Sequence, residues 1–190
     1  MRKIDLIILA AGESSRFGSL KGFAHYAGKP LLESAIELHQ KNFHGKTIIV
    51  YSRHSIEYKK NLSNRYRQAH FIENSNPHNG PFSSLQIGLT QSEADHYFIL
   101  PVDCPCRTLS TWDSLYTNIT PNKCVIKPSF KKKGGHPIIF NQVVKEQALK
   151  MPSTNRTDEF IRSLPLEKIK YIDVNDPTVL KNINSRDDLN

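Results

Sequence analysis

Short apolar runs alternate with amphipathic stretches along the 190-residue chain. The apolar runs predict strands, and apolar positions at helical spacing predict helices. The predicted strands span 4–10, 47–52, 70–73, 96–102, 123–128, 137–140 and 168–174. One predicted helix starts at Pro30, and the others span 54–66, 82–92, 108–119, 141–150, 157–164 and 186–190. This alternation is typical of one α/β domain over residues 1–190, with a mostly parallel sheet.

A loop of small and cationic residues follows the first predicted strand. Ile4–Leu9 is apolar on both faces, as in a central parallel strand, and Ala10–Gly12 has little or no side chain. Backbone N–H groups at such a strand end have no ladder partner and can donate to phosphate oxygens. Arg16 and Lys21 follow and supply positive charge. We interpret residues 9–21 as a triphosphate-binding loop; the alternative is an ordinary connection with solvated cations.

Two established phosphate-binding motifs do not fit this loop. The dinucleotide fingerprint needs G-x-G-x-x-G, and the P-loop needs G-x-x-x-x-G-K-[ST]. Gly12 and Gly18 are too far apart for the first motif, and Gly18 is followed by Ser19-Leu20-Lys21. The loop therefore belongs to another class of nucleotide site.

Polar residues also follow two other predicted strands. Asn79–Ser84 comes after the third strand, and Asp103 ends the fourth. Ligands of open parallel sheets collect at the carboxyl ends of the strands, where the strand order reverses. A single carboxylate there suits Mg²⁺, which prefers oxygen ligands and often takes only one or two from the protein. The alternative is that Asp103 caps the next turn.

Composition and charge narrow the class of protein. The chain has no long apolar run and no charged-then-apolar leader, so we expect a cytoplasmic protein without membrane contact. The formal net charge of +8 indicates an anionic partner. No nucleic-acid motif accompanies Lys131–Lys133, which we interpret as a solvated turn; the alternatives are contacts to nucleic acid or to a substrate phosphate. Cys104, Cys106 and Cys124 are expected to be free thiols.

The loop LAAGESSRFGSLK (residues 9–21) resembles the signature loop of the MobA-like nucleotidyltransferases, which include the molybdenum cofactor cytidylyl- and guanylyltransferases. Four further blocks follow in the family's order: Asn79–Leu89, Leu100–Pro105, Gly135–Phe140 and Asn182–Leu189. The resemblance covers nearly the whole chain. It implies a Rossmann-like three-layer α/β/α sandwich with a mostly parallel central sheet, similar to the nucleotide-diphospho-sugar transferases.

The resemblance also implies roles for single residues. Arg16, Lys21 and Asp103 are the implied catalytic residues, and Asp103 is the implied Mg²⁺ ligand. Asn184 is the implied second metal contact, directly or through water, and Asn182 is expected only to support it. Several relatives carry aspartates in this block and others asparagines, and an amide brings no charge. Asp187 or Asp188 is expected to cap the last helix instead. The implied nucleotide-binding set is Leu9, Ala10, Ala11, Gly12, Arg16, Lys21, Asn79, Gly80, Ser83, Ser84 and Asp103.

Two segments resemble the family's second-substrate region. In the first, Gly135 lets the main chain approach a ligand, and His136 hydrogen-bonds its phosphate or pterin; the alternative is a structural histidine. In the second, Arg156 binds a phosphate, while Thr157 or Asp158 caps a helix. Phosphate binding by Arg156 and helix capping by Thr157 or Asp158 are compatible with each other.

The implied function is a Mg²⁺-dependent nucleotidyltransferase that joins an NMP unit to a phosphomonoester, molybdopterin above all, and releases pyrophosphate. Ala11 and Ser83–Leu85 resemble the CTP-using branch, whereas Gly80-Pro81 resembles the GTP-using branch; CTP is favoured. The alternatives are a sugar-phosphate or isoprenoid-precursor acceptor, a non-catalytic nucleotide-binding module and a nucleic-acid-binding protein. The resemblance also implies transient contact with molybdoenzymes or their chaperones.

Overall fold

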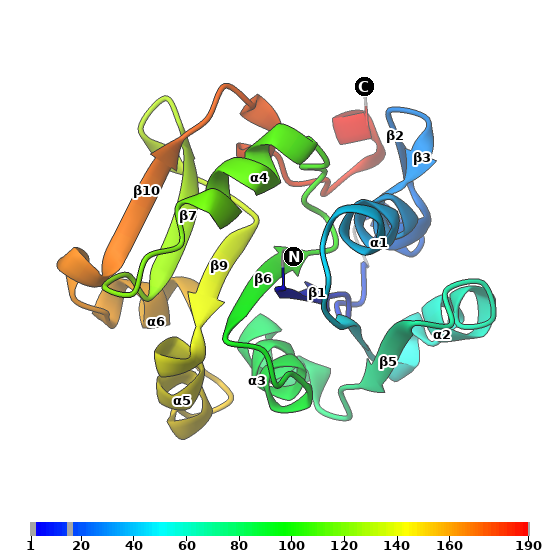
Figure 1. The fold of residues 1–190 in the computed structure, drawn as a ribbon. Helices are drawn as coiled ribbons and strands as arrows, with labels where there is room; N and C mark the ends of the chain where they lie inside the picture. Colours follow the sequence, from blue (N-terminus) through cyan, green and yellow to red (C-terminus); the bar gives the residue numbers. More distant parts are fainter. Residues whose placement is uncertain (1–2, 15–16, 190) are drawn as a thin grey trace.

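The computed structural model describes residues 3–14 and 17–189. Within these residues, an eight-stranded sheet runs in the order β10-β7-β9-β6-β1-β4-β5, and the short β8 pairs with β7 (Figure 1). β9 runs antiparallel to β6 and β7, whereas the other long strands are parallel to one another. The strands are β1 (Asp5–Leu9), β4 (Thr47–Tyr51), β5 (Ala69–Glu73), β6 (His96–Pro101), β7 (Val125–Phe130), β8 (Lys133–Gly134), β9 (Ile138–Asn141) and β10 (Ile169–Asp173).

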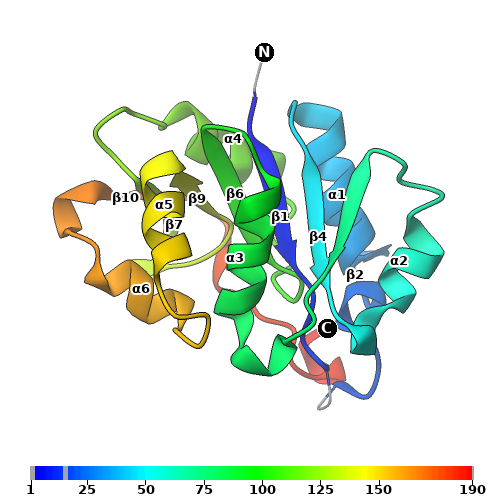
Figure 2. The same cartoon turned by 90° about the horizontal axis from the view of Figure 1, so that it is seen from below.

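Helices cover both faces of this sheet. On one side lie α1 (Leu31–Asn42) and α4 (Leu109–Thr117). On the other lie α3 (Pro81–Gln91), α5 (Gln142–Lys150) and α6 (Thr157–Ser163), which pass in front of the strands in Figure 2. The short α2 (Glu57–Leu62) lies beside β5. The expected α/β/α sandwich with a mostly parallel sheet is therefore confirmed.

The alternation of side chains along the strands explains why the central strands β1, β4 and β6 are largely apolar. In β1, Leu6 and Ile8 join the core that contains Trp112, whereas Ile7 between them joins the core that contains Phe82. Successive strand residues point to opposite faces, so a strand covered on both faces needs apolar residues at every position. Each such side chain, once buried, contributes about 1.5–3 kcal/mol.

The predicted elements agree with the structure to within a few residues, apart from the shortest ones. The predicted helix over 54–66 contains only the six-residue α2, which follows a 3-10 turn at Arg53–Ser55. A two-stranded hairpin, β2 (His25–Tyr26) with β3 (Lys29–Pro30), was not predicted, because two-residue strands carry no periodicity. The segment predicted as the last helix is a 3-10 turn, Arg186–Leu189.

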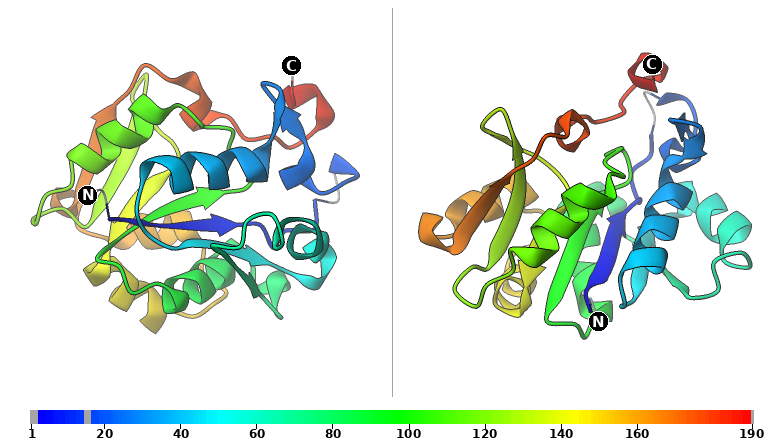
Figure 3. Two further views of the ribbon diagram at one scale, coloured as in Figure 1. Left: turned by 45° about the vertical axis from the view of Figure 1, so that its right-hand side comes forward. Right: turned by 45° about the horizontal axis from the view of Figure 1, so that its top comes forward.

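The strand order reverses between β1 and β6. The chain passes from β1 to β4 and β5 on one side, then crosses to β6 on the other. Leu9 and Pro101 are register partners, so the segments that follow β1 and β6 leave the sheet side by side at its carboxyl edge (Figure 3). This is the position at which open α/β sheets bind ligands. None of the described helices is long and apolar enough to cross a membrane.

Candidate functional site

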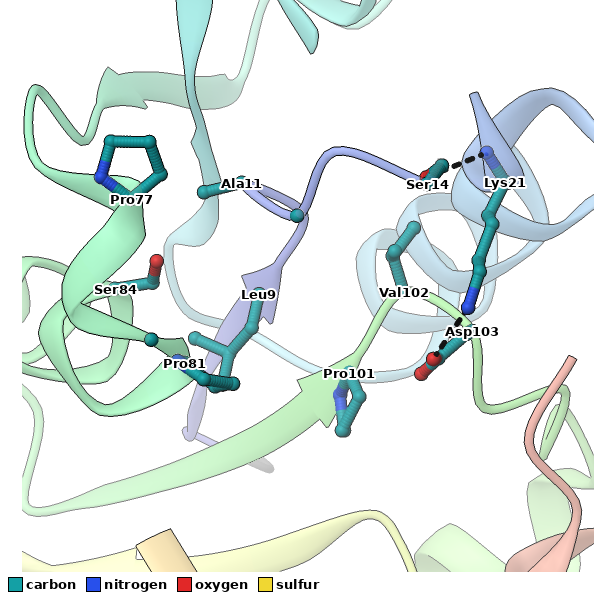
Figure 4. A pocket seen from close by; sticks show the side chains of 12 residues that line it. Leu9, Ala11, Ser14, Lys21, Pro77, Pro81, Ser84, Pro101, Val102 and Asp103 are labelled. Atoms are coloured by element: carbon teal, nitrogen blue, oxygen red, sulfur yellow. Dashed lines mark hydrogen bonds and ion pairs between the residues drawn. The ribbon is translucent and has the colours of Figure 1, made fainter. Parts of the chain in front are cut away.

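A cavity of about 270 Å³ opens where the strand order reverses (Figure 4). Its walls come from three connections: the loop after β1, the segment that leads into α3, and the end of β6. The lining residues are Leu9, Ala11, Gly12, Ser14, Lys21, Pro77, Gly80, Pro81, Ser84, Pro101, Val102 and Asp103. Seven of the implied nucleotide-binding residues are therefore brought to one cavity by the fold.

The start of the loop after β1 is anchored by two buried hydroxyl groups. Ser52 Oγ donates to the carbonyl oxygen of Ala11, and Ser55 Oγ donates to that of Ala10, both over 2.9 Å. Ser52 and Ser55 are fully buried. Because these bonds hold the two carbonyl groups, they fix how the backbone passes Gly12, whose missing side chain leaves open space.

Lys21 is placed by a 3-10 turn, Lys21–Phe23, that is held to α2. The backbone N–H of Gly22 donates to Tyr58 Oη over 2.7 Å. A Cβ atom at Gly22 would lie 2.8 Å from the Tyr58 ring, so the contact requires glycine. Burial raises the pKa of Tyr58 to about 12, which keeps the phenol neutral. The turn is therefore fixed, and the Lys21 side chain points across the cavity to Asp103 (Figure 4).

The ammonium group of Lys21 is bound by two oxygen atoms from distant parts of the chain. Lys21 Nζ lies 3.3 Å from Asp103 Oδ2 and 3.0 Å from Asn184 Oδ1. The Ile183 N–H donates to the Asp103 carbonyl oxygen over 2.8 Å and holds the carboxyl-terminal segment in place. Asp188 accepts from the N–H groups of Asn184 and Ser185 rather than facing Lys21.

A carboxylate and an amide oxygen that converge on one cation form a donor set suited to Mg²⁺. Mg²⁺ prefers oxygen ligands and completes its shell with water and phosphate oxygens, so two protein ligands suffice. The described part of the chain contains no cluster of three or more His, Cys, Asp or Glu residues that could hold a metal ion. Asp103 and Asn184 are oxygen donors of the kind that Mg²⁺ prefers, and both now contact the Lys21 ammonium group.

The segment before α3 forms the wall opposite Lys21. Gly80 has a φ of +91°, which favours glycine, and it places Pro81 at the first position of α3. Ser84 lines the cavity, whereas Ser83 Oγ donates to the Gly80 carbonyl oxygen over 2.7 Å. Asn79 Nδ2 donates to a serine hydroxyl outside the cavity. Ser83 and Asn79 thus shape this wall instead of lining it.

A second cavity of about 570 Å³ adjoins the first, because Leu9, Pro81 and Pro101 line both. The remaining lining residues are Ile99, Lys127, His136, Ile138, Arg156, Thr157, Asp158, Ile161 and Asn182. Lys127 was not singled out from the sequence. The sequence feature that could have identified Lys127 is its position within the apolar run of β7, where a charged side chain is unusual.

The implied second-substrate residues differ in their surroundings. Burial lowers the pKa of His136 to about 4, so its ring is neutral at neutral pH. Arg156 is exposed and forms ion pairs with Asp158 and Glu159. A Cβ atom at Gly135 would lie 2.1 Å from the Val179 carbonyl oxygen, so glycine is needed there for packing.

The remaining predicted site residues lie as follows. Ala10 is buried at the start of the loop after β1, and Asn182 lines the second cavity rather than contacting Lys21. Arg16 lies outside the described residues. Cys104 and Cys106 are buried free thiols, and Cys124 is also free, as expected.

Two relatives are similar to this chain in sequence. A protein of Bacillus velezensis named probable molybdenum cofactor guanylyltransferase is 28% identical, with 99% of this chain and 93% of that protein covered. A Bacillus cereus protein of the same name is 34% identical over 65% of this chain and 60% of its own length.

Solved structures show the same fold at lower identity. A Mycobacterium tuberculosis protein in complex with manganese matches with a TM-score of 0.77 at 16% identity, over 98% of this chain and 95% of that one. A 4-diphosphocytidyl-2C-methyl-D-erythritol synthase from Anaerococcus prevotii matches with a TM-score of 0.72 at 16% identity, over 99% and 95%.

The family model of the MobA-like NTP transferase domain matches residues 6–169. This match includes the loop after β1, the start of α3 and the end of β6, the three connections that form the first cavity. The chain therefore belongs to the MobA-like NTP transferase family and is a nucleotidyltransferase.

Proposed function

We propose that the protein transfers a nucleoside monophosphate from an NTP to the phosphate of molybdopterin and releases pyrophosphate. The observation that carries this proposal is the pair of adjoining cavities. Leu9, Pro81 and Pro101 line both, so ligands in the two cavities would meet across one short boundary. A transfer reaction between two bound substrates needs this arrangement.

The first cavity has the features of a triphosphate site. Gly12 leaves the loop backbone open to a ligand, and Lys21 supplies a fixed positive charge. Asp103 and Asn184 would hold Mg²⁺, which when bound neutralises phosphate charge and orients the leaving pyrophosphate. Arg16 belongs to the same loop and is proposed to add a second cation.

The second cavity suits an anionic acceptor, because Lys127 and Arg156 line it. In the proposed reaction an acceptor phosphate oxygen attacks the α-phosphorus, and the bond to the oxygen that bridges the α- and β-phosphorus atoms breaks. A phosphomonoester is already anionic at neutral pH, so the protein needs no strong general base. The work of the chain is alignment and charge neutralisation by Lys21, Arg16 and the loop N–H groups.

We propose GTP as the donor in place of the CTP favoured by the sequence. The cavity is lined by residues of both signatures: Gly80 and Pro81 of the GTP-like one, and Ala11 and Ser84 of the CTP-like one. The support for GTP therefore comes from the relatives named guanylyltransferase. Use of CTP stays a prediction that the same assay tests.

The experiment measures pyrophosphate release with each of the four NTPs and Mg²⁺, in the presence of molybdopterin, glucose 1-phosphate or methylerythritol phosphate. We expect release with GTP and molybdopterin only. Release with CTP and molybdopterin would correct the donor. Release with a sugar phosphate would correct the acceptor. If no pair supports release while GTP still binds, the protein is a nucleotide-binding module and the proposed transfer is wrong.

A further inference from the structure

Polar atoms without partners gather in the wall of the second cavity. In residues 3–14 and 17–189, three buried side-chain atoms have no hydrogen-bond partner: Gln40 Nε2, His136 Nδ1 and Thr157 Oγ1. His136 and Thr157 both line this cavity. Buried polar atoms in folded proteins are normally paired. Two unpaired atoms in one wall therefore indicate that a polar ligand belongs there.

Lys127 is a third group without a partner in the same wall. Its side chain is half-buried, and burial lowers the pKa of its ammonium group. Within the described residues, this ammonium group forms no hydrogen bond or ion pair. Asp158 is the carboxylate whose charge acts on Lys127, but Asp158 is bound by Arg156 and Arg162. A partly desolvated ammonium group without a counter-ion is costly, and a bound anion removes that cost.

The neutral ring of His136 has a defined hydrogen-bonding capacity. Burial keeps the ring neutral, so one ring nitrogen carries a proton and the other offers a lone pair. Nδ1, the nitrogen without a partner, can therefore form one hydrogen bond to a ligand group in this cavity. Because a neutral ring adds no positive charge, Lys127 is the better candidate for the phosphate.

We propose that Lys127 binds the phosphate of the acceptor, that Thr157 donates to the same phosphate, and that His136 forms a hydrogen bond to a polar group elsewhere in the acceptor. The acceptor class is then a phosphomonoester that also carries a second polar group. This inference rests on the proposed function, because it assigns the second cavity to the acceptor.

The test compares Lys127→Met with Lys127→Arg and with the control Lys170→Met. Lys170 lies on the neighbouring strand β10, and its Nζ is held by Asn118 outside the cavity. We expect Lys127→Met to raise the KM for molybdopterin about tenfold or more, as for loss of a charged hydrogen bond, and to leave the KM for the NTP within about twofold. Lys127→Arg should recover most of the loss, and Lys170→Met should match the parent protein.

A binding measurement separates this inference from the transfer reaction. Calorimetry with inorganic phosphate, in the presence of a saturating non-hydrolysable GTP analogue, should show binding to the parent protein and to Lys127→Arg but not to Lys127→Met. Equal phosphate binding and equal KM for molybdopterin in parent and Lys127→Met would overturn the inference while leaving the proposed function intact. Lys127-dependent phosphate binding without transfer to molybdopterin would support Lys127 and reject the proposed acceptor.

Lys21 links the metal-binding oxygen atoms to the nucleotide cavity. Its ammonium group is bound by Asp103 and Asn184, the same two oxygen donors that fit Mg²⁺. The Lys21 side chain is 14% exposed. A metal ion bound by these two oxygen atoms would have to displace Lys21, and a triphosphate would offer Lys21 new partners. We infer that Lys21 makes metal binding depend on nucleotide, and that the metal enters as its NTP complex.

Mn²⁺ titrations followed by electron paramagnetic resonance test this second inference, which also rests on the proposed metal site. Without nucleotide, we expect Lys21→Met to bind Mn²⁺ about tenfold more tightly than the parent protein, because the competing cation is gone. The control is Lys127→Met, which removes a charge from the neighbouring cavity without touching Asp103.

The outcomes separate the inference from the metal site itself. Adding a GTP analogue should strengthen Mn²⁺ binding by the parent protein and close the gap to Lys21→Met. Equal Mn²⁺ affinity of parent and Lys21→Met without nucleotide would overturn the coupling. An equal gain in Mn²⁺ affinity in Lys127→Met would also overturn the coupling, because loss of any nearby positive charge would then explain the tighter binding. Absence of Mn²⁺ binding in every form would reject the metal site as well. A rise of Tm with Mn²⁺ in Lys21→Met alone would confirm that this variant is folded.

Discussion

Asp103 is the one carboxylate among the described residues that line the first cavity. Replacing it with asparagine keeps the shape and removes the charge that a metal ion needs. We expect Asp103→Asn to lower turnover about a hundredfold or more and to leave the fold intact. Pyrophosphate release and thermal melting measure the two effects. Asp187→Asn, an exposed change in the last turn, is the control. Turnover near the parent value would reject Asp103 as the metal ligand.

The residues of the first cavity were predictable to different degrees. Lys21 and Asp103 follow apolar strands, and the ends of parallel strands meet at one edge, so the sequence places both. Ser52 and Ser55 hold the loop after β1 from another part of the chain, and no local pattern marks them. Lys127 and Thr157 became candidates only because the structure shows what surrounds them. Side-chain contacts between distant segments are not encoded in local periodicity.

At the scale of elements, α3 packs unusually close to the sheet because of one glycine. A Cβ atom at Gly88 would lie 2.3 Å from Cγ2 of Ile7, in the middle of β1. We expect Gly88→Val to lower the free energy of unfolding by about 1–3 kcal/mol through overpacking. Because α3 also carries Pro81 and Ser84 into the first cavity, NTP affinity should fall as well.

Urea unfolding and NTP titration measure the Gly88→Val effects. Thr90→Val is the matched control, since Thr90 is exposed on the same helix. Stability equal to that of the parent would mean that α3 can move away from β1 without loss. In the sequence, Gly88 is one residue of the block Asn79–Leu89 that resembles the family; only the packing of α3 on Ile7 shows what its missing side chain allows.

For the whole molecule, two histidines make stability depend on pH. Burial lowers the pKa of His136 to about 4, and burial also lowers that of His39, whose ring is held by Thr47 and Ile4. In the unfolded chain both rings titrate near pH 6.5. Below that pH the unfolded chain binds protons that the native state does not, so the free energy of unfolding falls as pH drops from about 6.5 to 4.

Chemical unfolding at several pH values measures this dependence. The free energy of unfolding of the parent protein should fall between pH 7 and pH 4.5. We expect His136→Gln to make this fall smaller by about 1–3 kcal/mol. His25→Gln, an exposed change in β2, should keep the slope of the parent protein. A parent protein whose stability does not change over this range would show that neither ring is held neutral.

The boundary formed by Leu9, Pro81 and Pro101 also affects how the reaction ends. In the proposed reaction a dinucleotide product would join the occupants of both cavities into one molecule, so it would keep contacts with both walls and bind as a single body. We expect the product to inhibit competitively against either substrate, with an inhibition constant below both KM values. Rapid-quench measurements should show a burst of pyrophosphate in the first turnover, followed by a slower steady rate set by product departure. The same continuity makes the dinucleotide a template for bisubstrate inhibitors of this enzyme.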